Sequence, residues 1–209
     1  MPTKRPESAI PPLSDDESLS LAQIREKLAY YPARHLAESN ELAHAAVAMI
    51  LRENPAGKEH EILIIQRAEH PRDPWSGHLG FPGGRLEAQD ASPERAAVRE
   101  TQEELGLFLD SSARLLGALS EIRARSLFQL LPLTIFPFVY ELLEPTPLQQ
   151  NEEVEEVRWV PLRFFLNRAN RSTMPHPRSP EHILPCYPLG NRAIWGLSLR
   201  MLDELLFKS

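Results

Sequence analysis

Three glutamates are predicted to lie on one face of a short helix. Glu100, Glu103 and Glu104 are three and four positions apart, a spacing that places side chains on the same side of an α-helix. Like charges at this spacing repel one another and weaken an isolated helix. A hard divalent cation would offset the repulsion, since Mg²⁺ takes oxygen ligands between carboxylates and substrate phosphates. The pattern predicts a site for Mg²⁺, or Mn²⁺ in its place, with these glutamates as ligands.

The residues around the glutamates define both ends of this helix. Ser92 suits the N-cap, Pro93 the first helical position, and Glu94 the positive end of the helix dipole. Gly106 can take the left-handed conformation that ends a helix. We therefore expect a helix from Pro93 to Leu105.

A glycine turn precedes the helix. Pro82 is followed by Gly83 and Gly84, and glycine makes such a turn at the lowest steric cost. A backbone carbonyl of Gly83 or Gly84 would suit Mg²⁺ by its hardness, so Gly84 joins the predicted metal ligands. The alternative is a solvated acidic helix face after a tight turn, which explains neither the glycines nor Arg99.

The turn and the helix together resemble the signature of the Nudix hydrolases. That signature is a glycine, five residues, an acid, then Arg-Glu and Glu-Glu-x-Gly. The matching residues are Gly84, Asp90, Arg99, Glu100, Glu103, Glu104 and Gly106. Asp90 stands where the usual pattern has Glu, and eight rather than seven residues separate it from Arg99. The resemblance implies an α/β/α sandwich with a mixed β-sheet over residues 40–165, and a metal-dependent hydrolase of nucleoside diphosphates linked to another group.

The same resemblance implies that one glutamate acts as the general base. Glu103 is the candidate on the helix, and Glu152 or Glu153 is the candidate in a loop. Of the loop pair, Glu153 enters the predicted catalytic set. Taken alone, this acidic run reads as a solvated turn before a strand at 157–160.

Arg99 completes the predicted catalytic set, with two interpretations. It binds phosphate, or it pairs with a carboxylate such as Glu87 or Asp90 and fixes the turn against the helix. The second is favoured, because a neighbour of three metal-binding glutamates is well placed to orient them.

The segment before the turn is similar to the coenzyme A pyrophosphatase branch of the Nudix proteins. It runs from Leu63 through Arg67 and Arg72 to Gly77 and the glycine turn. An aspartate at the Asp90 position, with the longer spacing, also fits this branch. One departure is that four residues, not three, separate Arg72 from Gly77. A coenzyme A-type substrate is favoured, with ADP-ribose, dinucleotide polyphosphates and nucleotide sugars as alternatives.

Four side chains are predicted to contact the substrate. Arg67, Arg72 and Arg85 can each offer a bidentate guanidinium to phosphate. His78, with Trp75, can stack on a base. The alternative for Trp75 is a packed side chain in a loop.

Composition limits the classes of function. The chain has 209 residues, a formal charge of −6 and one cysteine. The acidic balance argues against a nucleic-acid partner, including an RNA 5′ end, while a cation and local arginines still allow an anionic small molecule. The cysteine count excludes an intrachain disulfide and fits a reducing compartment, which we take as the cytoplasm. We expect neither a secretory signal nor a membrane span, and the sequence allows a homodimer. A catalytically silent Nudix module is the rival class, which the intact glutamates disfavour.

The hydrophobic pattern of the rest of the chain predicts its domain organisation and secondary structure. Residues 1–18 are polar and proline-rich and are expected to be mobile. Residues 19–209 are expected to form one domain, whose C-terminal part, 166–209, is a loop and a helix. We predict strands at 43–51, 62–65, 115–122, 130–143 and 157–160, with helices at 19–31, from 161, and at 193–206. Residues 168–191, rich in Pro, Arg and His, are predicted to be loop.

Overall fold

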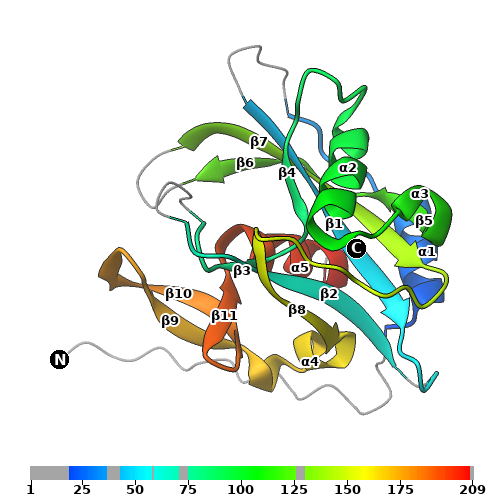
Figure 1. Cartoon of the computed structure of the whole chain (residues 1–209). Helices are drawn as coiled ribbons and strands as arrows, with labels where there is room; N and C mark the ends of the chain where they lie inside the picture. The colour runs from blue at the N-terminus through cyan, green and yellow to red at the C-terminus, as the bar shows by residue number, and fades with distance from the viewer. Residues whose placement is uncertain (1–18, 37–42, 58, 71–74, 126–129, 208–209) are drawn as a thin grey trace.

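A mixed β-sheet with helices on both faces forms the body of the protein (Figure 1). The computed structural model describes residues 19–36, 43–57, 59–70, 75–125 and 130–207. The strand order is β3-β2-β1-β7-β5, with β4 on β1, β6 on β7 and β8 on β2. The strands β1 and β7 run parallel, and the other pairs of this sheet are antiparallel. The α/β/α sandwich with a mixed sheet is confirmed, whereas the segment 1–18 lies outside the described residues.

The strands of this sheet are β1 (Ala43–Glu53), β2 (His60–Arg67), β3 (Leu79–Gly80), β4 (Gly83–Arg85), β5 (Ala113–Ala118), β6 (Ile122–Arg125), β7 (Leu130–Leu142) and β8 (Val154–Pro161). The helices are α1 (Leu21–Ala29), α2 (Pro93–Leu105), α3 (Leu109–Ser112), α4 (Leu162–Leu166) and α5 (Gly196–Phe207), with a 3-10 turn η1 (Arg168–Asn170).

Alternation along the strands divides the core into two layers. In β1, Ala48 and Ile50 pack with α2, whereas Met49 and Leu51 pack with α1 and α5. Successive side chains of a strand point to opposite faces, so one strand serves both layers. The glutamates of α2 are therefore separated from α1 and α5 by the sheet.

Several predicted elements are confirmed, and one is divided. The strands at 43–51 and 62–65 form an antiparallel pair, and 157–160 lies in β8. The strand predicted at 115–122 is two strands, β5 and β6, which pair with β7 one after the other. Pro137 lies between the parts of β7 that pair with β5 and β6.

The prediction of a loop over 168–191 is wrong. This region contains β9 (Ser172–His176) and β10 (Ser179–Leu189), which form a second sheet with β11 (Arg192–Trp195) in the order β11-β10-β9 (Figure 1). Prolines were the misleading signal. Pro175 lies in the edge strand β9, and Pro180 lies where the register between β9 and β10 shifts, and both are places where a sheet tolerates proline. Because β11 takes residues 192–195, the last helix begins at Gly196 instead of Ala193.

Across the described ranges, no helix has both the length and the apolar character needed to cross a membrane.

Candidate active site

Helix α2 begins and ends as its sequence predicts. The Ser92 hydroxyl accepts the Arg95 N–H at 3.3 Å, and Pro93 is the first helical residue. At the other end Gly106 has φ of 63°, and its N–H donates to the Gln102 carbonyl at 2.8 Å. These caps satisfy backbone groups that the helix itself leaves unpaired, so they fix the position at which the glutamates emerge.

The glycine turn lies between β1 and α2 because neither glycine carries a side chain. At Gly83, with φ of +145°, a Cβ would lie 2.2 Å from the Ala46 carbonyl oxygen. At Gly84, a Cβ would lie 2.3 Å from Glu100 Oε1. The first glycine permits the close pairing of β4 with β1, and the second leaves room for the Glu100 carboxylate.

Glu104 is a buried carboxylate directed at this turn. The residue is 1% exposed, and its Oε2 accepts the Gly83 N–H at 2.9 Å. Its Oε1 has no hydrogen-bond partner among the described residues. Arg67 Nη1 lies 3.6 Å from Oε1, which is an ion-pair distance but too long for a hydrogen bond. Burial raises the pKa of Glu104 to about 8, against the lowering effects of Gly83 and Arg67.

The loop before β8 places Glu153 next to the C-terminal end of α2 and the end of β2. The Asn151 N–H donates to the Glu104 carbonyl at 3.0 Å, and the Glu153 carbonyl accepts the Ala68 N–H at 2.8 Å. These bonds hold the start of β8 between the end of α2 and the end of β2. The Glu153 charge contributes to the raised pKa of both Glu100 and Glu104. The Glu153 carboxylate is exposed, and its role as the general base stays a prediction.

The other two helix glutamates differ in burial. The Glu100 side chain is 15% exposed, and burial raises its pKa while the neighbouring Arg99 opposes that shift. The Glu103 side chain is 55% exposed and accepts a hydrogen bond from Arg99 Nη1 at 2.9 Å. In the part of the chain that the structure describes, no three His, Cys, Asp or Glu side chains converge closely enough to hold a metal ion. The donors nevertheless fit a hard cation: Glu104 Oε1 lacks a hydrogen-bond partner, and Glu100 faces a glycine.

Arg99 connects the helix to the turn. Its Nε donates to Asp90 Oδ1 at 3.1 Å, and its Nη2 donates to Asp90 Oδ2 and to the Arg85 carbonyl, each at 3.0 Å. Its Nη2 also lies 3.1 Å from Glu100 Oε1. The hydrogen bond from Arg99 lowers the pKa of Asp90, and the Glu87 N–H also donates to Asp90. This geometry agrees with the interpretation of Arg99 as the partner of Asp90, and its catalytic role stays a prediction.

We expect Arg99→Lys to lower kcat/KM by roughly 10–100-fold, the usual cost of losing a group that orients metal ligands. Lysine keeps the charge but cannot make the forked contacts to Asp90 and Arg85. Steady-state kinetics together with circular dichroism would measure the effect. Unchanged kinetics in a folded Arg99→Lys protein would show that the fork does not position the helix acids.

The structure places only some of the residues predicted to contact the substrate near the helix glutamates. Arg67 lies beside Glu104, and the Arg67 N–H donates to the His78 carbonyl at 3.0 Å. The Arg85 side chain is exposed, and Arg72 lies outside the described residues. Trp75 packs against a hydrophobic cluster that includes Ala45, in agreement with the packed alternative for this tryptophan.

The sequence interpretation missed that Trp195 contacts both His78 and His176. The Trp195 ring centroid lies 4.9 Å from that of His78 and 5.5 Å from that of His176. His176 fell in the region predicted to be loop, and Trp195 was assigned to the start of a helix. No local pattern in the sequence indicates that these rings meet, because β9 and β11 are paired through β10.

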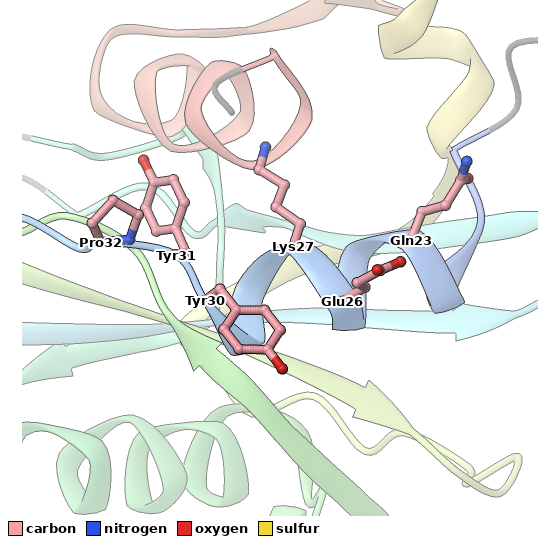
Figure 2. Close-up of a pocket in the computed structure, with 6 residues that line it drawn as sticks. All are labelled: Gln23, Glu26, Lys27, Tyr30, Tyr31 and Pro32. Atoms are coloured by element: carbon pink, nitrogen blue, oxygen red, sulfur yellow. The ribbon is translucent and has the colours of Figure 1, made fainter.

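A pocket of about 360 Å³ lies elsewhere, beside α1 (Figure 2). In Figure 2 Lys27 points toward α5, and its Nζ donates to the Leu205 carbonyl at 2.9 Å. The residues that line the pocket are Gln23, Glu26, Lys27, Tyr30, Tyr31 and Pro32. The sheet separates α1 from the glutamates of α2, so this pocket is not where those acids would act.

Comparison with known proteins shows which family the chain matches. The model of the NUDIX domain matches residues 42–177. The chain is 34% identical over 131 residues to peroxisomal coenzyme A diphosphatase ndx-8 of Caenorhabditis elegans, covering 62% of this chain and 53% of that protein. It is 32% identical over 142 residues to mitochondrial coenzyme A diphosphatase NUDT8 of Homo sapiens, covering 66% and 58% respectively. It thus spans less than two thirds of either relative.

The fold is also that of solved Nudix structures. A MutT/nudix family protein from Enterococcus faecalis matches with a TM-score of 0.53 and 20% identity, covering 89% of this chain and 68% of that one.

Proposed function

Because the chain belongs to the NUDIX family, we propose that it hydrolyses the diphosphate bond of a nucleoside diphosphate linked to a second group. The buried Glu104 carboxylate carries this proposal. It faces the glycine turn beside Glu100, and burial raises its pKa, with a smaller contribution from the Glu153 charge. Burying an acid without a partner for one oxygen costs free energy, and binding a divalent cation would offset that cost.

Each group of side chains has a defined task in this hydrolysis. Glu100, Glu103 and Glu104, with a carbonyl of the Gly84 turn, would hold the cation, and Arg99 would keep the helix and the turn in register. A bound Mg²⁺ or Mn²⁺ neutralises diphosphate charge and activates the attacking water. Water attacks one phosphorus, and the bridging oxygen leaves with the other phosphate.

The general base is Glu153 or Glu103. Both carboxylates are exposed enough to reach a water in front of the turn. Glu153 is the better candidate, because Glu103 already accepts a hydrogen bond from Arg99 and belongs to the proposed cation ligands. A general base must be within hydrogen-bond reach of the attacking water, and Glu153 can take this position without first releasing Arg99 or the cation.

Coenzyme A is the favoured substrate. The support is the sequence similarity to two proteins named as coenzyme A diphosphatases, together with the residues from Leu63 to Gly84 and the Asp90 spacing. Those relatives are named as peroxisomal and mitochondrial, so the cytoplasm is our proposal from composition alone. ADP-ribose, nucleotide sugars and dinucleotides share the same diphosphate chemistry. A silent binding module is disfavoured, since it would gain nothing from an acid buried like Glu104.

A panel of diphosphates with Mg²⁺, analysed by mass spectrometry, tests the proposal. We expect coenzyme A to be cleaved to 4′-phosphopantetheine and 3′,5′-ADP, faster than ADP-ribose, a nucleotide sugar or a dinucleotide polyphosphate. Much faster turnover of ADP-ribose would reject coenzyme A while keeping the hydrolase. No turnover of any member with either Mg²⁺ or Mn²⁺ would reject the hydrolase.

A further inference from the structure

The second sheet reaches the proposed active site through β3. The pairing of β2 with β3 places His78 opposite Arg67, whose guanidinium lies 3.6 Å from Glu104. The strand β11 contacts β3 in turn, and Figure 1 shows β11 beside it. Strand β11 is therefore separated from Arg67 of β2 by β3 alone, and His176 of β9 reaches the same junction through its ring contact with Trp195.

Three rings meet at this junction: His78, Trp195 and His176. The Trp195 ring is tilted at 59° to His78 and stands edge-on at 84° to His176. All three residues are half-buried, so each keeps part of its surface accessible. Such an arrangement gives a planar ligand aromatic surface held in place by its own neighbours.

The junction is tied to the main sheet on both sides. Arg192 of β11 donates to the Glu69 carboxylate at 3.0 Å, across the loop that leads to His78. Ser198 at the start of α5 donates to the Leu79 carbonyl at 3.1 Å. These contacts fix the rings relative to the glycine turn, and a site fixed in advance loses less ordering entropy when a ligand binds.

We propose that this ring cluster, Trp195 with His78 and His176, binds the nucleobase of the substrate. The inference rests on the proposed function only in taking the ligand to be a nucleotide. Bases stack on aromatic side chains through their π-faces, and imidazole and indole rings both serve. The second sheet, of which β10 and β11 lie beyond the residues 42–177 matched by the family model, thereby becomes part of the substrate site.

Equilibrium binding of AMP and of ribose 5-phosphate to the full chain, measured by calorimetry with Mg²⁺ present, tests this proposal. Neither probe contains a diphosphate, and the two differ by the base. We expect the wild type to prefer AMP, and we expect Trp195→Ala and His176→Ala to reduce that preference by roughly tenfold or more, the usual worth of one stacked base. Trp195→Phe keeps an aromatic ring and should retain most of the preference for AMP.

His182→Ala is the matched control. His182 lies on β10 of the same sheet and pairs with Glu181 at 3.3 Å, so its loss should leave the AMP preference unchanged. If Trp195→Ala fails to fold by circular dichroism, His176→Ala decides. An unchanged AMP preference in folded His176→Ala, or an equal loss of affinity for both probes, would overturn the proposal. Failure to hydrolyse any diphosphate would reject the proposed function and leave this measurement unaffected.

Discussion

Glu104→Gln is expected to reduce kcat/KM for the preferred diphosphate by at least about 100-fold, because losing a ligand should exceed the roughly 10–100-fold effect of losing an outer partner. Glutamine keeps an oxygen to accept the Gly83 N–H, which Glu104 Oε2 does at 2.9 Å. The substitution removes the charge and leaves the turn supported. Steady-state kinetics at saturating Mg²⁺ would measure the loss.

The same substitution should stabilise the metal-free protein at alkaline pH. The folded-state pKa of Glu104 is about 8, raised by burial above its ordinary value of 4.5. A raised carboxyl pKa contributes stability that is complete below about pH 4.5 and lost as the pH rises through about 8. At pH 9 in EDTA we expect Glu104→Gln to unfold with a free energy about 1–3 kcal/mol higher than the wild type, and with little difference at pH 4.

Glu103→Gln is the control for the effect on stability. Glu103 lies on the same helix face but is 55% exposed. Its replacement should also remove most hydrolysis, but it should change the free energy of unfolding by no more than about 0.5 kcal/mol, the worth of an exposed helical ion pair. Urea unfolding at both pH values separates the variants. A Glu104→Gln protein with no gain at pH 9 would show that this carboxylate is not buried in its charged form.

The two glycines of the turn should respond differently to alanine. We expect Gly83→Ala to destabilise the protein by about 3 kcal/mol or more, since both backbone strain and overpacking would result. Its Cβ would lie 2.2 Å from the Ala46 carbonyl oxygen and 2.6 Å from Val47 Cα, at φ of +145°. Backbone atoms in the middle of a strand cannot move aside without disturbing the sheet.

Gly84→Ala is its matched comparison. The nearest atoms to its Cβ belong to the Glu100 carboxylate, the nearest at 2.3 Å, and a flexible side chain can rotate away. The fold should be retained within about 1 kcal/mol, while hydrolysis should fall at least about tenfold because a proposed ligand is displaced. Thermal unfolding and kinetics of both variants would check the pair. Equal stability losses at Gly83 and Gly84 would contradict the described packing of the turn.

Local chemistry explains which parts could be predicted from the sequence. The bounds of α2 follow from Ser92, Pro93 and Gly106, because caps and proline act within a few residues. The spacing of Glu100, Glu103 and Glu104 gave a common helix face for the same reason. The place of Glu153 beside them depended on resemblance to a family, since its own acidic surroundings read as a solvated turn.

Contacts between distant segments could not be predicted in this way. Glu104 is buried under the turn while Glu103 is exposed. The helical period places Glu104 on the face of buried Ala97 and Thr101, but the turn that covers its carboxylate is a contact that the spacing does not indicate. The second sheet was missed because its prolines resemble those of a loop. The edge position of Pro175 and the register shift at Pro180 are defined only by the pairing of β9 with β10. Trp195 meets His78 across more than a hundred residues of chain, so neither propensity nor spacing indicates the contact.

Hydrolysis before and after the return of Mg²⁺ tests most directly whether α2 holds a catalytic cation. The protein would be dialysed against EDTA and assayed on the fastest diphosphate of the panel, with products identified by mass. We expect no turnover without metal, full recovery in the wild type when Mg²⁺ is added, and no recovery in folded Glu104→Gln. Full turnover in excess EDTA, or wild-type turnover in Glu104→Gln, would contradict the assignment of the glutamates of α2 to a catalytic metal site.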